Sequence, residues 1–243
     1  MDISFQTDAP RERKDAAAAG DRASAIVRSI EAAIVGQRLP PGAKLPEDEL
    51  GAAFGVSRTI VRAALRMLAQ DRVVTLAPNR GAFVSSPTVE EARQVFHARR
   101  VVEDALVREA AARCDEADLD RLRSHLDAER DALRRGDRSA AIGLSGEFHL
   151  LVGSISGQKV LVTFLRELIS RSALVIALFG TTRESSCGSH DHAEVVEALA
   201  RRDGEAAAAI MADHLRHIEH DVELSGEPRP SVRLADVLAD LRR

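Results

Sequence analysis

Apolar residues recur at the spacing of a helix near the start of the chain and then give way to shorter patterns. The apolar positions of the first pattern share one helix face: Ile26, Ile30, Ala33 and Ile34. The run stops at the Pro-Pro-Gly sequence of residues 40–42, and a short second helix is expected over residues 47–54. Gly55 permits a tight turn, and Ser57 then suits the N-cap of a third helix that ends near Gln70.

Two β-prone segments follow the third helix. Residues 73–76 and 82–84 are rich in residues that favour strands, and residues 77–81 between them have the composition of a turn. This pattern predicts a β-hairpin. The order helix, helix, turn, helix, hairpin is typical of a winged helix-turn-helix.

From residue 87 onward, the periodic segments all have the period of a helix. Helices are expected over residues 89–113, 118–135, 138–156, 160–181, 191–201 and 204–224. Asp137 and Asp203 stand where an N-cap is needed, and the Gly- and Ser-rich residues 185–189 are expected to separate two helices. We therefore predict a mainly α protein, with an N-terminal winged helix-turn-helix and a C-terminal all-α helical bundle.

These patterns divide the chain into four segments. Residues 1–20 have no helical period and are expected to form a flexible arm, and residues 21–86 are expected to form the winged helix-turn-helix domain. Residues 87–225 are expected to form an all-helical domain. Residues 226–243 should be a tail whose short amphipathic helix packs on its own domain or on a partner subunit; its apolar stripe is Leu234, Val237, Leu238 and Leu241.

The charges are divided unevenly between the two domains. Residues 21–86 hold nine Lys and Arg against six Asp and Glu, a net charge of +3, so the rest of the chain, whose total is −4, carries −7. A basic N-terminal segment fits a DNA partner. No apolar stretch is long enough for a membrane span, no signal peptide is recognisable, and two cysteines make no disulfide framework, so a cytoplasmic protein is expected.

The start of the third helix carries candidate DNA contacts. Four polar residues emerge there: Ser57, Arg58, Thr59 and Arg62. Arg58 and Arg62 are one turn apart and project from one face, and an Arg side chain can bind the O6 and N7 atoms of guanine or a phosphate. Taken alone, two Arg on one helix are also typical of a solvated surface.

Together with the wing, these residues resemble the GntR family of bacterial regulators. The matching motifs are residues 44–47, 56–59, 61–62 and 80–84. The resemblance implies that the following residues contact DNA: Ser57, Arg58, Thr59, Arg62, Arg80 and Gly81. Two positions depart from the pattern, because Asp48 stands where FadR-like members often carry Arg and cannot bind phosphate, and Ile60 stands where Pro is common.

The C-terminal helices resemble the FCD domain of FadR-like members of that family. The matching segments are residues 99–103, 147–149, 192–203 and 207–215. Many FCD domains hold a divalent metal with one carboxylate and three histidines, and the histidine positions here are His149, His192 and His214. Three imidazoles with an open position suit Zn, Ni or Mn, and the carboxylate of an effector could complete the coordination shell.

The carboxylate ligand is absent from its family position. Ser145 stands one helical turn before His149, where the family has Asp, and Glu147 lies about 200° round the helix and should point elsewhere. Cys187 or His190 could substitute if their loop folds inward. Three alternatives stay open: a three-His metal site completed by water or effector, a metal-free effector pocket lined by the same histidines, and core histidines without a ligand.

Several polar side chains are candidates for binding a carboxylate effector. They are Arg99, Arg100, Ser145 and Arg171. Alternatively, Arg100 pairs at the surface with Glu103 or Asp104, and Arg171 covers only a helix face.

We conclude from the sequence that the protein is a metabolite-responsive transcription regulator and not an enzyme. A homodimer is expected, because one recognition helix reads only half of a palindromic operator in double-stranded DNA. Repression is the expected sign of regulation. The rival hypotheses are a metal-free sensor of an acyl or carboxylate metabolite, and a metal-dependent enzyme fused to a DNA-binding domain, for which no general base stands beside the histidines.

Overall fold

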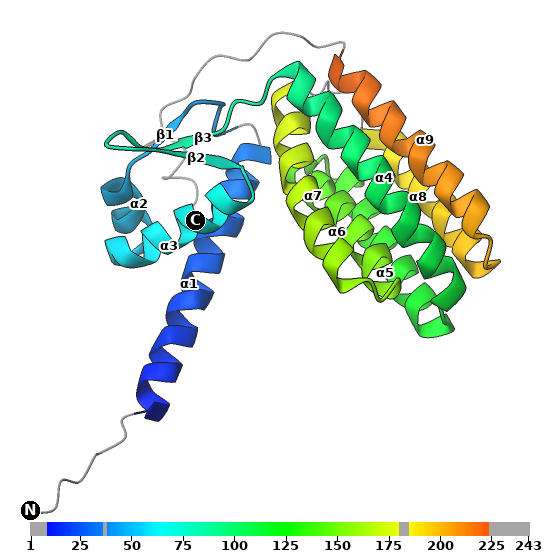
Figure 1. Cartoon of the computed structure of the whole chain (residues 1–243), viewed down its shortest axis with the longest axis horizontal. Coiled ribbons are helices and arrows are strands. Elements are labelled where there is room, and N and C mark those ends of the chain that lie inside the picture. Colours follow the sequence, from blue (N-terminus) through cyan, green and yellow to red (C-terminus); the bar gives the residue numbers. More distant parts are fainter. Residues whose placement is uncertain (1–8, 36–37, 180–184, 224–243) are drawn as a thin grey trace, which may run out of the picture.

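The computed structural model describes residues 9–35, 38–179 and 185–223, which form a small winged domain beside a helical bundle (Figure 1). The elements of the winged domain are α1 (Ala9–Val35), β1 (Lys44–Leu45), α2 (Glu47–Phe54), α3 (Arg58–Gln70), β2 (Val74–Ala77) and β3 (Gly81–Val84). The strands form an antiparallel sheet in the order β1-β3-β2, in which Val74 pairs with Val84. The expected helix-turn-helix and hairpin are confirmed, whereas the two-residue strand β1 was not predicted.

One apolar core holds the winged domain together. Side chains from three helices are fully or almost fully buried in it: Ile26, Ile30, Ile34, Leu50, Leu65 and Leu68. The turn between α2 and α3 depends on Gly55, whose φ of 64° lies in the left-handed region that favours glycine. The apolar residues that recur at helical spacing in the sequence therefore form the buried face of each helix.

The first helix is longer than the sequence predicts. Residues 1–20 were expected to be an arm without helix, but α1 begins at Ala9. The run Ala16–Ala19 explains the difference, because alanine has the highest intrinsic helix propensity and needs no apolar period to be helical. Residues 1–8 and the predicted tail 226–243 lie outside the described residues.

The bundle consists of longer helices. They are α4 (Val89–Arg113), α5 (Glu116–Arg134), α6 (Arg138–Ile155), α7 (Lys159–Phe179), α8 (Ser185–Ala200) and α9 (Gly204–Glu223). The expected caps are confirmed, since the carboxylates of Asp137 and Asp203 accept hydrogen bonds from the backbone N–H of Ala140 and Ala206, both at 3.0 Å. The expected break over residues 185–189 is wrong, because α8 already begins at Ser185; in a helix N-terminal turn, Ser and Gly cost little. No helix of the described residues is long and apolar enough to cross a membrane.

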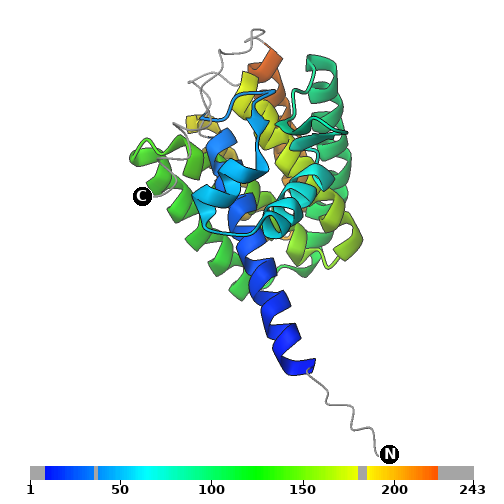
Figure 2. The ribbon, with the colours of Figure 1, turned by 90° about the vertical axis from the view of Figure 1, so that its left-hand side faces the viewer.

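Helix α7 belongs to both parts of the molecule. Its residues Leu174 and Ala177 are buried in the core of the winged domain, whereas Val175 and Phe179 pack with Phe96 of α4 inside the bundle. Helix α1 also contacts the bundle, and the Ser139 hydroxyl at the start of α6 donates a hydrogen bond to the Ala32 carbonyl at 3.2 Å. Figure 2, viewed from the winged domain, shows this domain in front of the bundle.

Candidate DNA-binding surface and three-histidine site

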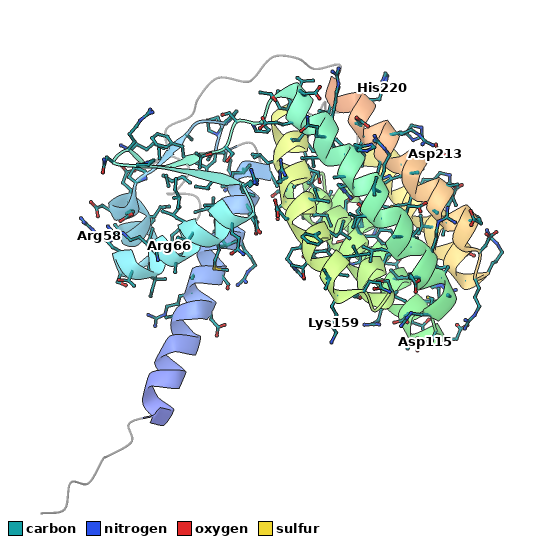
Figure 3. All side chains as sticks on the ribbon, in the orientation of Figure 1. Arg58, Arg66, Asp115, Lys159, Asp213 and His220 are labelled. Atoms are coloured by element: carbon teal, nitrogen blue, oxygen red, sulfur yellow. The ribbon has the colours of Figure 1, made fainter. Side chains whose placement is uncertain are left out.

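The start of α3 is exposed, as the sequence predicts for a recognition helix. Ser57, Arg58, Thr59 and Arg62 are all exposed, and Arg58 projects from the outer edge of the winged domain (Figure 3). Ser57 occupies the N-cap position, but its side chain makes no capping hydrogen bond, contrary to the expectation. Arg66, one further turn along α3, is also exposed and extends the basic row; its i+4 spacing was visible in the sequence, but it was not predicted.

The two candidate arginines are each held by a carboxylate of α2. Arg62 donates from Nε to Oε2 of Glu47 at 2.8 Å. The Nε atom of Arg58 lies 2.5 Å from Oδ1 of Asp48, the residue that stands where relatives often carry Arg. Asp48 therefore contacts the recognition helix and is part of the candidate DNA-binding surface.

The tip of the wing presents a second basic group. Arg80 is exposed, and its guanidinium carbon lies 5.6 Å from the ring centroid of Phe83, a cation–π contact that orients the side chain. Gly81 has a φ of 98°, so a larger residue there would strain the backbone. DNA contacts by these residues, and by those of α3, remain predictions.

Three histidines meet in the interior of the bundle. His149 of α6, His192 of α8 and His214 of α9 are at most 2% exposed. Their ligand atoms all lie within 4.8 Å of one another, and the ring centroids of His192 and His214 are 4.6 Å apart. The three side chains that the sequence selected are therefore brought together.

Each histidine ring has a carboxylate behind it. The Nδ1 atom of His149 lies 2.5 Å from Glu103 Oε2, that of His192 lies 3.0 Å from Glu129 Oε2, and that of His214 lies 3.2 Å from Asp191 Oδ2. A carboxylate accepts, so each Nδ1 carries the proton and each Nε2 keeps its lone pair. Sequence reasoning missed these three roles; the only local signals are that Asp191 precedes His192 and that Glu103 follows Arg99 by one turn.

The Nε2 atoms of the three rings lie close to one another. Those of His192 and His214 are 3.2 Å apart, and that of His149 is buried without a hydrogen-bond partner. Two lone pairs at this distance repel each other, whereas a cation between them turns the repulsion into coordination. Neutral imidazoles on carboxylate supports are the donor set that zinc and similar metals take in proteins, so the residues present fit a divalent metal.

Burial keeps the rings of His149 and His192 neutral. Burial lowers the pKa of His149 to about 3, although Glu103 opposes the shift. Burial and the nearby His214 hold the pKa of His192 well below its usual range. For Glu103, burial favours the neutral acid, but the charge of Arg99 and the hydrogen bonds from Arg99 and His149 outweigh it and lower the pKa of Glu103 to about 2. Histidine ligands of a metal must be neutral, and the lowered pKa values of His149 and His192 meet this requirement.

The candidate effector residues lie at three different places. Arg99 is only 3% exposed; it donates to Glu103 at 2.7 Å and to the Ser172 hydroxyl at 3.0 Å, and its third nitrogen, NH2, is buried without a partner. Arg100 pairs with Glu219 of α9 and not with Glu103 or Asp104. Arg171 pairs with Glu167 at 3.7 Å and lines a cavity of about 470 Å³ between the winged domain and the bundle.

The structure also shows where other residues near the three histidines lie. Ser145 is half-buried, one turn before His149, and Glu147 is exposed, as expected. His190 does not supply a fourth ligand, because its side chain is exposed and lies 3.4 Å from Glu194. The Cys187 side chain lies outside what the structure describes.

Comparisons with known proteins identify the two domains. Residues 22–84 match the family model described as bacterial regulatory proteins, gntR family, and residues 94–217 match the FCD domain. The chain is 28% identical to the HTH-type transcriptional repressor RspR of Escherichia coli K12 over 198 residues, which are 81% of this chain and 87% of the relative. It is 30% identical to an HTH-type transcriptional regulator of Streptomyces ambofaciens over 195 residues, 76% of this chain and 78% of that one.

Solved structures share the fold. A GntR transcriptional regulator from Rhodococcus sp. RHA1 superposes with a TM-score of 0.72 at 28% identity, covering 85% of this chain and all of that one. McbR/YncC of E. coli gives a TM-score of 0.73 at 19% identity over 85% of this chain and 99% of that one, a likeness of fold alone.

Proposed function

The chain belongs to the GntR family of bacterial regulatory proteins and carries an FCD domain, which makes it a DNA-binding transcription regulator; we propose that it senses a small carboxylate at a divalent metal. The metal would be held by His149, His192 and His214. When bound, it would supply a positive charge and an open coordination position. The observation that carries the proposal is the convergence of three buried histidines, each with a carboxylate behind its Nδ1 atom. Among the described residues, the Nε2 atom of His149 has no hydrogen-bond partner.

A carboxylate effector fits the groups around that point. Ser145 replaces the family's carboxylate ligand and so leaves a coordination position for another anion. The NH2 group of Arg99 is a buried donor without a partner, and a carboxylate bound to the metal would satisfy it. Arg99 is therefore the strongest candidate for the effector's second contact, whereas Arg100 and Arg171 have carboxylate partners of their own.

The same arginine offers a route to the DNA-binding domain. Arg99 donates to Ser172 of α7, and two residues further along α7, Leu174 enters the core of the winged domain. An effector that draws Arg99 toward the metal would weaken its bond to Ser172 and favour a different position of α7. The winged domain would move with that helix, which is how ligand binding would change DNA affinity.

We propose a homodimer that represses transcription from a palindromic operator. A single α3 reads only half a site, and the relative RspR is named a repressor. Exposed apolar side chains on the adjacent helices α4 and α7 fit a contact with a second copy: Val101, Val160 and Phe164. Light scattering of the full chain should give the mass of a dimer, and Phe164→Glu should give a monomer.

Zinc titration of protein prepared without metal tests the sensing site. Isothermal calorimetry should detect one zinc per chain, and His192→Ala should abolish binding. His220→Ala, an exposed histidine of the neighbouring helix α9, is the matched control and should bind as the wild type does. If wild-type protein takes up no Zn, Ni or Mn, the metal is not part of the sensor, and the metal-free pocket becomes the better account.

A further inference from the structure

The two arginines of α3 that are candidate DNA contacts, Arg58 and Arg62, are each held in an ion pair. Both ion pairs use the Nε atom, Arg62 with Glu47 at 2.8 Å and Arg58 with Asp48 at 2.5 Å. The carboxylates come from α2 and the arginines from α3, so each pair crosses the turn of the helix-turn-helix. Among the described residues, the terminal nitrogens of Arg58 and Arg62 have no other ion-pair or hydrogen-bond partner.

We propose that Glu47 and Asp48 determine the sequence specificity of this regulator by holding Arg62 and Arg58 as readers of base edges. This inference rests on the proposed operator binding through α3. A carboxylate on Nε fixes the plane of the guanidinium and leaves its outer nitrogens to donate. Guanine offers two acceptors, O6 and N7, at a spacing that suits such a planar pair of donors.

Charge supports the same assignment. An unpaired Arg gains affinity from any phosphate, whatever the sequence, through release of counterions. An Arg paired with a carboxylate is locally neutral, so its attraction to phosphate is reduced, while its hydrogen bonds to the uncharged acceptors of guanine remain. The carboxylates thus lower binding to non-cognate DNA more than binding to the operator, which raises the ratio between the two.

Neither ion pair is expected to contribute much to the stability of the fold. The side chains of Arg58 and Asp48 are 65% and 68% exposed and those of Arg62 and Glu47 are 56% and 32% exposed, and exposed ion pairs contribute little to stability. The two ion pairs are therefore best explained by the guanidinium nitrogens that they present to DNA.

The experiment uses the full-length protein with two duplexes of equal length and composition. One is the site that wild-type protein selects from a random DNA pool, and the other is a scrambled version of it. Affinities are measured by fluorescence anisotropy over a series of salt concentrations for Glu47→Gln and Asp48→Asn. Glu49→Gln is the matched control, because Glu49 is an exposed neighbour on α2 with the same charge but no ion pair among the described residues.

Glu47→Gln and Asp48→Asn should each bind the scrambled duplex more tightly, with a salt slope steeper by about 1, the value for one additional phosphate contact. The ratio of specific to non-specific affinity should fall by about five- to tenfold, within the range that one bidentate base contact provides. Glu49→Gln should change neither the salt slope nor the ratio.

The possible outcomes separate the specificity role of Glu47 and Asp48 from operator binding through α3. If Arg58→Ala and Arg62→Ala weaken binding of the selected site but the α2 variants behave as Glu49→Gln does, the specificity role is wrong and operator binding through α3 stands. If the arginine variants bind the selected site as tightly as the wild type does, both are wrong.

Discussion

The carboxylate behind His192 should control metal affinity without touching the metal. Glu129 of α5 is buried, and its Oε2 atom lies 3.0 Å from the Nδ1 atom of His192. Glu129→Gln keeps the size of the side chain but removes its charge. The amide can also turn its NH2 group toward Nδ1, which favours the tautomer with the proton on Nε2, where it blocks coordination.

The expected loss is between about tenfold and a hundredfold in zinc affinity, the usual effect of removing such a supporting group. This corresponds to roughly 1.4–2.8 kcal/mol. Of the three supporting carboxylates, Glu129 tests the idea best, because Glu103 also pairs with Arg99 and Asp191 lies 3.9 Å from a second histidine, His217. Phe148 stacks on the His192 ring at a centroid distance of 4.1 Å, so the ring should stay in place when Glu129 is changed.

Calorimetric titration with zinc, supported by the zinc-induced rise in melting temperature, measures the effect. Glu147→Gln makes the same change on the exposed face of α6 and should leave the zinc affinity as in the wild type. Equal zinc affinities of Glu129→Gln and the wild type would refute the view that these carboxylates fix the histidine tautomers.

Three further predictions follow from other contacts. Ser145→Asp should tighten zinc binding by about tenfold and weaken the binding of acetate to the zinc-loaded protein. Calorimetry measures both affinities, and unchanged acetate binding would show that the effector does not use this coordination position. Ser172→Ala removes the hydroxyl that Arg99 contacts and should reduce the zinc-induced change in hydrogen exchange of α1 and α3. The control Ser154→Ala, at an exposed position, should not reduce this change. An equal change in both variants would exclude Ser172 from the route between the metal site and the winged domain. Burial and the charge of Asp71 raise the pKa of Glu31 to about 7, above its ordinary value of 4.5, so its contribution to stability is present below about pH 4.5 and lost as the pH rises through 7. Glu31→Gln should therefore be more stable than the wild type by about 1–2 kcal/mol at pH 8 and equally stable near pH 4.5 in urea unfolding, and identical pH profiles would contradict this.

The fold was predictable where one helix face must be buried. The apolar period located α1, α3 and the bundle helices, and Asp137 and Asp203 marked the helix starts correctly because a cap is a local interaction. The errors came where helix formation needs no such period, as in the Ala-rich start of α1 and the Ser-rich start of α8. The strand β1 was missed because two residues carry no period at all.

The candidate site was predictable only in part for a related reason. The resemblance to FCD domains located His149, His192 and His214, but the carboxylates behind them depend on how helices pack. Glu129 lies 63 residues from His192 along the chain, and no spacing rule connects the two. The same holds for Ser172, which lies 73 residues from Arg99.

The supporting carboxylates also bear on the serine at position 145. A divalent cation at the three Nε2 atoms would bring two positive charges and Arg99 a third, and ionised Glu103, Glu129 and Asp191 would supply three negative charges to balance them. A carboxylate at position 145 would add a negative charge to a balanced interior and oppose an incoming anion. With serine there, the charges would stay balanced until an effector arrived, and the carboxylate of that effector could bind both the metal and the unpartnered NH2 of Arg99. The departure from the family pattern at Ser145 is therefore what we expect of a site that uses an anionic effector as its fourth ligand.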